Sequence, residues 1–490
     1  MKKLGSFLHH SNQENLKVKK KRVEKLEKEI IDEQKEKERS LKLSIKEGCV
    51  ASVMSGAGDA YVVPYALALN ANNAQIGYLT SLAGLIGPSA QIIGSRLMYK
   101  YSRKRLIVSS VFLHASMWVV FLLLGLLYWK GFMTGYDTST IFIILYCAYA
   151  LFGSLGGPAW FSLMGDLVDA RKRGRYFGKR NIITGIVNIT VTLAAAFILD
   201  YTKNYGLVIF GFIIIFTIAA IGRFISCYLM TRHYYPKNSM KKDDYFSFWQ
   251  FIKKASGNNY GKFVIFVGLV TLGTNIAAPF FSVYMLKELG YSYVWFTIVT
   301  LSAGVFTLLS MTFWGKIGDK YGNRRLLKIG MFMIPVLPLP WIFFKDPITL
   351  IFTAQLLSGL GWAAFNLGAS NYIYDAVTPG RRGFCVAYFN MTNGAGVFFG
   401  AIAGGLIAQY VHFSFINIFF FIFIISSLLR ALPGFILLPK IKEVRAISNE
   451  KENVVTSILS PTRPLFDMFR GVLLIITDFK VKIKNHTTFE

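Results

Sequence analysis

The chain alternates between long apolar stretches and short polar connections over most of its length. A helix needs about 20 mostly apolar residues to cross a bilayer, and twelve stretches meet that requirement. They lie at residues 49–70, 75–99, 105–128, 140–164, 177–199, 206–230, 262–286, 292–314, 326–344, 348–374, 383–409 and 413–438. Their apolar residues run on, as in FIIIFTIAAIG, instead of alternating as barrel strands do. The pattern predicts an all-α polytopic membrane protein with twelve transmembrane helices.

The polar segments divide this apolar chain into two halves and two tails. Residues 1–48 form a charged N-terminal tail, which we expect to be a solvated or surface-lying helix. Residues 231–261 form the longest internal polar connection, between six spans at 49–230 and six at 262–438. In the C-terminal tail, 439–490, the segment PLFDMFRGVLLIITDFKVKI is amphipathic and predicts an interfacial helix.

Composition and charge support a membrane location. Charged residues make up 16% of the chain, against about 25% in soluble domains. If both termini share one side, the charges in the opposite loops cancel, and the formal net charge of +28 falls on the terminal side. Those opposite-loop residues are Lys130, Asp137, Asp200, Lys203, Lys287, Glu288, Lys345 and Asp346. Because Lys and Arg are retained in the cytoplasm, we expect a multi-pass protein of the cytoplasmic membrane with both termini inside. Nucleic acid is not expected as a partner, because the sequence has no soluble domain on which basic residues gather.

Two pairs of similar sequences recur at corresponding places in the two halves. SRLMYKYSRKRLIV, at 95–108, aligns with GKIGDKYGNRRLLK, at 315–328, so that both basic pairs coincide. DLVDARKRGRYFGKRN, at 166–181, aligns with DAVTPGRRGFCVAYFN, at 375–390. The pairs follow the second and the fourth span of each half. Two six-helix halves repeated in parallel are the architecture of many secondary transporters.

GKIGDKYGNRRL resembles the signature G-x-x-x-D-[RK]-x-G-[RK]-[RK] of the major facilitator superfamily (MFS). The matching residues are Gly315, Asp319, Lys320, Gly322 and Arg324. Asn323 replaces one basic residue of the signature, and the first copy has Tyr99 in place of the acid. The resemblance covers roughly residues 49–438 and implies the MFS fold, with two pseudo-symmetric six-helix halves and alternating access.

The resemblance also implies a cytoplasmic gate made of charged side chains at helix ends. Charge-assisted contacts of this kind close one face and must break when that face opens. The predicted gate residues are Asp319 with Arg324 and Arg325, and Asp166 and Asp375 with Arg173 and Arg382. The alternative is that these charges only fix the topology. Because the first copy lacks the acid, we assign the gating carboxylate of the signature only to the second.

Asp59 is the acid that lies deepest in a predicted span. It follows the cytoplasmic start of its span by about ten residues, which at 1.5 Å per residue places it near the midplane. Acids in the membrane are functional candidates by default, and some proton-coupled sugar porters of the superfamily carry one on the first helix. We therefore predict that Asp59 couples transport to H⁺ or contacts the substrate. The alternative is a carboxyl group that only hydrogen-bonds a neighbouring helix.

Polar and aromatic residues on several spans predict a substrate cavity. Gln355, Ser358, Trp362 and Asn366 share one helical stripe, and Asn275 and Trp160 lie beside prolines on other spans. Aromatic faces with amide groups suit a neutral organic solute, although such residues also join helices by hydrogen bonds. We interpret Arg223 and Arg430 as peripheral residues that snorkel to the interface, which disfavours a strongly anionic solute.

Motifs for other chemistries are absent from the sequence: it has no phosphate-binding loop, metal-ligand spacing or acyl-transfer triad. We therefore predict no enzyme, no cofactor and no metal site. The leading hypothesis is a monomeric secondary transporter that moves a small neutral, sugar-like solute with H⁺ as a symporter. An exporter of drugs or lipids is the first alternative, and a non-transporting receptor or scaffold using the charged tails is an alternative of another class. The direction of transport and the choice between H⁺, Na⁺ and no coupling ion stay open.

Overall fold

The computed structural model describes residues 32–169, 173–236, 248–255, 257–377, 382–414 and 416–444, and all their regular elements are helical. Eleven helices in this part of the chain are long and apolar enough to cross a membrane. They correspond to the predicted spans from 75–99 onward, and the all-α prediction is confirmed. The predicted interfacial helix of the C-terminal tail lies outside the described residues.

Contacts divide the chain into two compact units. One comprises Met1–Gln75 and Leu85–Lys241, and the other comprises Ile76–Gly84 and Lys242–Glu490. The boundary near residue 241 falls inside the predicted central connection, 231–261. Each unit is described by itself below.

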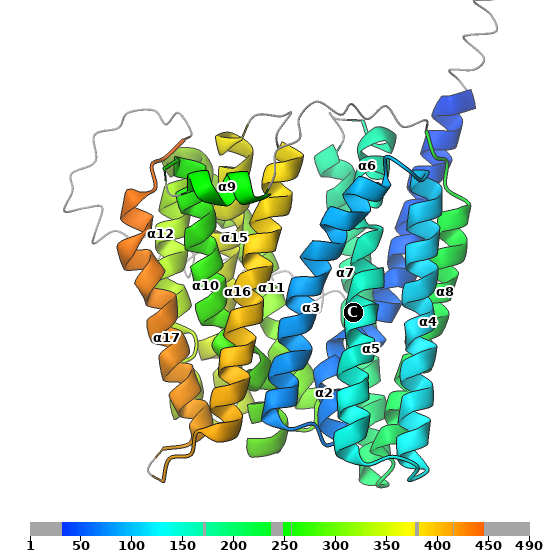
Figure 1. Cartoon of the computed structure of the whole chain (residues 1–490), viewed down its shortest axis with the longest axis vertical. Coiled ribbons are helices and arrows are strands. Elements are labelled where there is room, and N and C mark those ends of the chain that lie inside the picture. The colour runs from blue at the N-terminus through cyan, green and yellow to red at the C-terminus, as the bar shows by residue number, and fades with distance from the viewer. Residues whose placement is uncertain are drawn as a thin grey trace, which may run out of the picture. The chain divides into compact units, whose positions relative to one another are not determined.

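The first unit begins with a helix at 32–57 and the short 3₁₀ turn η1 (Asp59–Tyr61). Its other helices are α2 (Val62–Ala68), α3 (Asn73–Leu97, of which Ile76–Gly84 belong to the second unit), α4 (Arg103–Trp129), α5 (Gly135–Leu155), α6 (Gly157–Leu167), α7 (Arg173–Asn204) and α8 (Val208–Thr231). Side chains of Asn72, Ser102 and Thr134 accept hydrogen bonds from the first turns of α3, α4 and α5, which fixes where these helices start. Helices α4 and α8 lie side by side (Figure 1).

The opening helix starts well before the predicted first span. Ser40, Ser44 and Glu47, which we placed in a solvated tail, are buried, with exposures of 2%, 0% and 3%. The solvated interpretation is therefore wrong for this part of the tail. Its polar side chains are buried because the first unit supplies hydrogen-bond partners for them.

The predicted first span, 49–70, is not one continuous helix. The opening helix ends at residue 57, and η1 and α2 follow after a break at Gly58. A Cβ atom at Gly58 would lie 2.3 Å from the ring of Trp118 on α4, so this close approach requires glycine. The break places Asp59 at the start of η1.

The described part of the second unit contains six apolar helical segments, four of them interrupted. Its elements are α9 (Phe248–Ala255), α10 (Asn259–Val283), η3 (Tyr284–Glu288), α11 (Tyr293–Tyr321), α12 (Asn323–Met333), η4 (Ile334–Val336), α13 (Pro340–Phe343), α14 (Pro347–Leu350), η5 (Ile351–Gln355), α15 (Leu356–Ala376), α16 (Arg382–Tyr410), α17 (Ile418–Ile436) and η7 (Leu438–Lys440). Helix α10 packs against both α16 and α17 (Figure 1). Phe263, Val270 and Phe365 are among the buried residues of its core.

Two of these interruptions prepare a polar site inside the second unit. Pro338 has no N–H group, so the carbonyl of Ile334 loses its α-helical partner and instead accepts a longer 3₁₀ bond of 3.4 Å from Leu337. The π-helical turn η5 ends at Gln355, where α15 begins. π-Turns inside helices occur frequently at functional sites.

Candidate functional site

Asp59 lies at the break of the first span with its side chain exposed. The hydroxyl of Tyr149, on α5, donates a hydrogen bond to Asp59 Oδ1, and the side chain of Ser55 forms a second hydrogen bond with this carboxyl group. The Tyr149 ring packs against His114 at a centroid distance of 4.0 Å and against Trp118 at 5.1 Å. Two hydroxyl groups and a rigid aromatic wall therefore hold the carboxyl group of Asp59 in place.

His114 connects this carboxyl group to a cation. Arg223 Nε, on α8, donates to His114 Nδ1 at 3.0 Å, so His114 Nδ1 accepts and the imidazole is neutral with its proton on Nε2. Arg223 Nη1 also donates to Ser226 Oγ at 3.4 Å. A half-buried arginine therefore lies against the ring that packs on Tyr149.

A second acid lies beyond Ser226. The Ser226 hydroxyl donates to Glu47 Oε1 at 2.7 Å, and Arg180 Nη2 pairs with Glu47 Oε2 at 3.4 Å. We call Asp59, Tyr149, His114, Arg223, Ser226 and Glu47 the Asp59–Glu47 network. With Arg180 included, it carries two acids and two arginines, so its formal charges balance; Glu47, which is 3% exposed, is the member that most needs a partner.

Sequence reasoning found only one member of this network in a functional role. It singled out Asp59, took Arg223 as a snorkelling residue, and placed Glu47 in a solvated tail. Trp160, predicted for the substrate cavity, lies under the guanidinium of Arg180, whose Cζ atom is 5.2 Å from the ring centroid, and its cavity role stays a prediction. One feature of the sequence could have indicated the network: His114 is the one histidine inside a predicted span.

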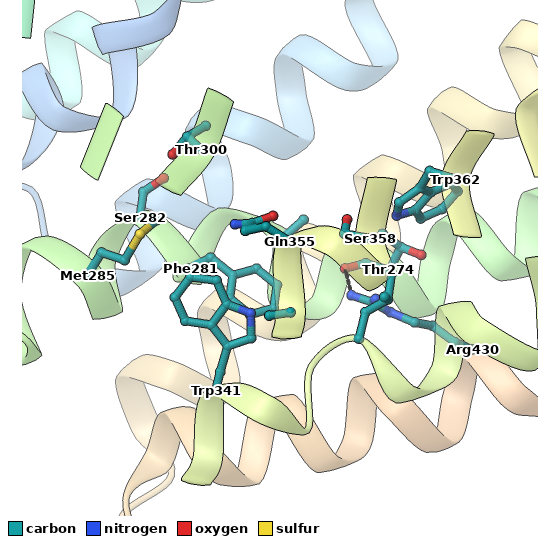
Figure 2. A pocket seen from close by; sticks show the side chains of 13 residues that line it. Thr274, Phe281, Ser282, Met285, Thr300, Trp341, Gln355, Ser358, Trp362 and Arg430 are labelled. Carbon is teal, nitrogen blue, oxygen red and sulfur yellow. Dashed lines mark hydrogen bonds between the residues drawn. The ribbon is translucent and has the colours of Figure 1, made fainter. Parts of the chain in front are cut away.

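The second unit contains a cavity of about 260 Å³. Its lining residues are Thr274, Ala278, Phe281, Ser282, Met285, Thr300, Leu337, Trp341, Ala354, Gln355, Ser358, Trp362 and Arg430. Three of the predicted cavity residues, Gln355, Ser358 and Trp362, are thus brought together (Figure 2). Asn366 and Asn275 are not among the lining residues, and Asn275 Nδ2 donates to Thr271 O within its own helix at 2.8 Å.

Arg430 lines this cavity and is only 2% exposed. Its guanidinium donates to Ser426 Oγ at 3.0 Å, to Thr274 O at 3.3 Å and to Ile334 O at 3.4 Å. The prediction that Arg430 snorkels to the interface is therefore wrong. Its charge stays inside because the carbonyl freed at η4 and two further acceptors meet it there.

Asp166, a predicted gate residue of the first unit, forms an ion pair with Arg103, which is not among the predicted gate residues. Arg103 Nη1 contacts Asp166 Oδ2 at 2.6 Å, and the Arg103 side chain is 2% exposed. Arg103 also donates to Ser162 Oγ at 3.1 Å and to Pro236 O at 2.6 Å. We expected Arg173 as a partner of Asp166, but the side chain of Arg173 lies outside the described part of the chain.

The corresponding place in the second unit has an amide instead of a guanidinium. Asn323, which aligns with Arg103 in the repeat, is fully buried and donates from Nδ2 to Asp375 Oδ2 at 2.7 Å. The side chain of Arg382, the expected partner of Asp375, is likewise outside the described part. Asn323, which replaces a basic residue of the signature, thus binds the carboxylate of Asp375 through an amide.

The other signature residues contact the end of the second unit. Asp319 is exposed near the end of α11. The backbone N–H of Arg324 donates to Glu443 Oε2 at 2.7 Å, and Arg324 Nη2 donates to Pro439 O at 3.1 Å. Arg325 lies over the ring of Tyr321 at 4.6 Å. Residues just after α17 therefore hold Arg324.

Metal chemistry finds no support in the described residues, where no group of three His, Cys, Asp or Glu side chains is placed to hold an ion. The described arrangement thus presents two candidate sites, the hydrogen-bonded carboxyl group of Asp59 and the cavity at Arg430.

Comparisons with known proteins agree with this architecture. A family profile described as "Major Facilitator Superfamily" matches residues 48–259 and 263–479. The "Multi-drug resistance efflux pump PmrA homolog" of Lactococcus lactis subsp. lactis (strain IL1403) is 26% identical over 353 residues, which is 68% of this chain and 76% of that protein. The "Multidrug resistance protein MdtH" of Escherichia coli (strain K12 / DH10B) is 27% identical over 161 residues, 32% of this chain and 39% of that protein.

Solved structures share the fold at low sequence identity. A POT family peptide transporter has a TM-score of 0.64 at 10% identity, covering 85% of this chain and 99% of its own. The nucleoside transporter NupG has a TM-score of 0.60 at 16% identity, covering 82% of this chain and 99% of its own. At these identities the likeness concerns the fold alone.

Proposed function

We propose that this chain, which belongs to the Major Facilitator Superfamily and is therefore a multi-pass membrane transporter, exports a small organic solute in exchange for H⁺ by alternating access. The observation that carries the proposal is the position of Asp59. Its exposed carboxyl group lies at a break in the first span and belongs to a charge-balanced network. Half-helices that end inside the membrane recur at the binding and coupling sites of transporters.

The network supplies a physical reason for coupling. Protonation of Asp59 removes one negative charge and leaves Arg223 and Arg180 opposed by Glu47 alone. A conformation that brings another negative charge or more water to Arg223 is then favoured. Proton binding thereby shifts the population of two states, which is what a coupled transporter requires.

The direction of transport rests on the two relatives, both of which are named as multidrug resistance proteins. Since the chain spans only 39% of one of them, export remains part of the proposal. The second candidate is uptake of a neutral, sugar-like solute together with H⁺. The aromatic and amide side chains of Trp362, Trp341 and Gln355 favour it, because such groups suit hydroxylated solutes.

Transport in proteoliposomes tests the proposal. Vesicles carrying the purified protein receive a pH gradient, and the flux of carboxyfluorescein, ethidium and radiolabelled glucose is followed. We expect gradient-driven export of at least one dye by the wild type. Asp59→Asn should abolish the gradient-driven part while exchange without a gradient persists. Asp137→Asn, at an exposed acid on α5, serves as the matched control and should behave as the wild type.

Three outcomes would contradict parts of the proposal. Gradient-driven flux that survives Asp59→Asn would remove Asp59 from the coupling. Glucose uptake without dye export would favour the second candidate. No flux of any probe from a well-folded preparation would favour the receptor or scaffold class.

A further inference from the structure

We infer that the cavity at Arg430 is a binding site for the anionic group of a compact amphipathic organic acid, either a carboxylate or a phosphate. The basis is a buried cation without a buried counter-charge. In the described part of the chain, no Asp or Glu side chain forms an ion pair with Arg430. All three of its hydrogen-bond acceptors are neutral. A charge in such surroundings is unfavourable unless a partner is supplied, and an anionic ligand supplies it.

The geometry of the guanidinium suits such a ligand. A guanidinium has five N–H groups, and Arg430 uses one on Nε and one on each Nη for its three hydrogen bonds. One N–H therefore remains on each Nη. Two adjacent N–H groups form the fork that binds a carboxylate or phosphate with two parallel hydrogen bonds.

The rest of the cavity defines the body of the ligand. Figure 2 shows the Arg430 side chain extending toward Thr274 and Ser358, with Phe281 and Trp341 lying together beside Gln355. The ring centroids of Phe281 and Trp341 are 5.0 Å apart with the planes inclined at 45°, and the two rings offer apolar surface to an aromatic ring. The amide of Gln355 and the hydroxyl of Ser358 add polar groups between this surface and the cation.

The size of the cavity limits the ligand. The volume of about 260 Å³ lies just below the range of about 300–1,000 Å³ that is usual for ligand pockets. This is room for one six-membered ring bearing one acidic group. Larger solutes would place only their acidic end here. The same chemistry has two sources, a soluble organic acid and the headgroup of an anionic lipid, and the experiment separates them.

Binding of benzoate to the purified full-length protein tests the inference, with benzamide as its neutral isostere. We expect benzoate to bind, to quench tryptophan fluorescence through Trp341, and to raise the melting temperature, since a ligand of the folded state stabilises it. Benzamide should bind roughly tenfold to a hundredfold more weakly, as should benzoate to Arg430→Gln, because each change removes a charged hydrogen bond. Arg39→Gln, at an exposed arginine of the opening helix, is the matched control and should bind as the wild type.

A second variant covers the case in which Arg430→Gln does not fold. Gln355→Leu keeps the cation and should weaken benzoate binding by roughly tenfold, because it removes a polar contact of the acid. In nanodiscs, a lipid source predicts that phosphatidylglycerol competes with benzoate while phosphatidylcholine does not. A soluble source predicts equal benzoate affinity in both lipids. Either result supports an anion site.

Equal affinity for benzoate and benzamide, or an affinity unchanged in both Arg430→Gln and Gln355→Leu, would overturn the inference. Binding to Arg430 does not depend on the proposed function, whereas export of such an acid does. The anion site and the proposed function can therefore be refuted independently. Benzoate binding is measured without a gradient, and proton coupling is measured by Asp59→Asn.

Discussion

Each unit has an arginine in its last long helix, Arg223 in the first and Arg430 in the second. The two arginines contact equivalent positions of the repeat, but their surroundings differ. Arg223 contacts His114, and Arg430 contacts Ile334, which stands 220 residues after His114, as Lys320 does after Lys100. In the first unit, Arg223 is joined through Ser226 to Glu47 and acts electrostatically on Asp59. In the second unit, Arg430 meets neutral acceptors only. The duplicated arginine is thus part of a closed charge network in one half and open to a ligand in the other.

The predicted cytoplasmic loops of the two units also differ in how their charges are paired. Arg103 and Asp166 form an ion pair at 2.6 Å, whereas Asn323 and Asp375 form a hydrogen bond between an amide and a carboxylate at 2.7 Å. The acid is retained in both halves, and among the described side chains it pairs with an arginine in the first half and with an amide in the second. Within this part of the chain the first unit carries more internal charge pairing at both levels, which is consistent with the division into a coupling half and a binding half proposed above.

The largest effect is expected from removing each arginine in turn. Arg223→Met removes the hydrogen bonds to His114 and Ser226 and leaves Asp59 and Glu47 opposed only by Arg180, and it should destabilise the protein by about 3 kcal/mol. Arg430→Met breaks no ion pair but leaves buried acceptors without their donor, so it should cost less, about 1–2 kcal/mol. Thermal and denaturant unfolding of both variants measure the difference. Equal losses would mean that the two arginines have the same role.

The helix break beside Asp59 gives the next largest effect. Gly58→Ala places a Cβ atom 2.3 Å from Trp118 and should cost about 1–3 kcal/mol, as overpacking does. Gly185→Ala is the matched control, since a Cβ at Gly185 meets nothing within 4 Å. That substitution should be neutral or stabilise the protein by up to about 1 kcal/mol. If Gly58→Ala were as stable as the control, the break would not depend on this close approach.

A smaller effect separates the two loops. Asp166→Asn breaks an ion pair, while Asp375→Asn leaves two amides that still hydrogen-bond. Because Asp166 is 49% exposed, solvent weakens its pair, and we expect the first change to cost only about 1 kcal/mol more than the second. If these contacts act as gates, the cytoplasmic face should open more readily in Asp166→Asn. An engineered cysteine in that variant should then react faster with a thiol reagent added on the cytoplasmic side. The opposite order in both measurements would remove the distinction between the loops.

The smallest effect concerns pH. Burial lowers the pKa of His233, which lies just beyond α8 and is 6% exposed. The folded state therefore prefers the neutral ring, and this contribution to stability is complete above the ordinary histidine pKa of about 6.5 and is lost as the pH falls below it. His233→Gln should flatten the melting temperature against pH in that acidic range. If the slope of melting temperature against pH were unchanged in His233→Gln, the acid sensitivity would come from another group.

The sequence was a good guide wherever the pattern is local. The apolar stretches, the repeated loops and the signature around Asp319 predicted the helices and the superfamily, and Asp59 stood out because acids are rare in apolar spans. Arg430 was misplaced because its burial depends on Ile334 and Thr274, which lie about 100 and 160 residues away in the chain. Glu47 was missed for the same reason. A glutamate in a run of Lys and Glu looks solvated until Ser226 and Arg180 are seen beside it.

The central claim is that Asp59 exchanges a proton. Infrared difference spectroscopy of the purified protein tests it directly, by following the C=O stretch of a protonated carboxylic acid as the pH is varied. The account predicts a pH-dependent band in the wild type and in Asp137→Asn that is missing in Asp59→Asn. An identical band in all three proteins would contradict it.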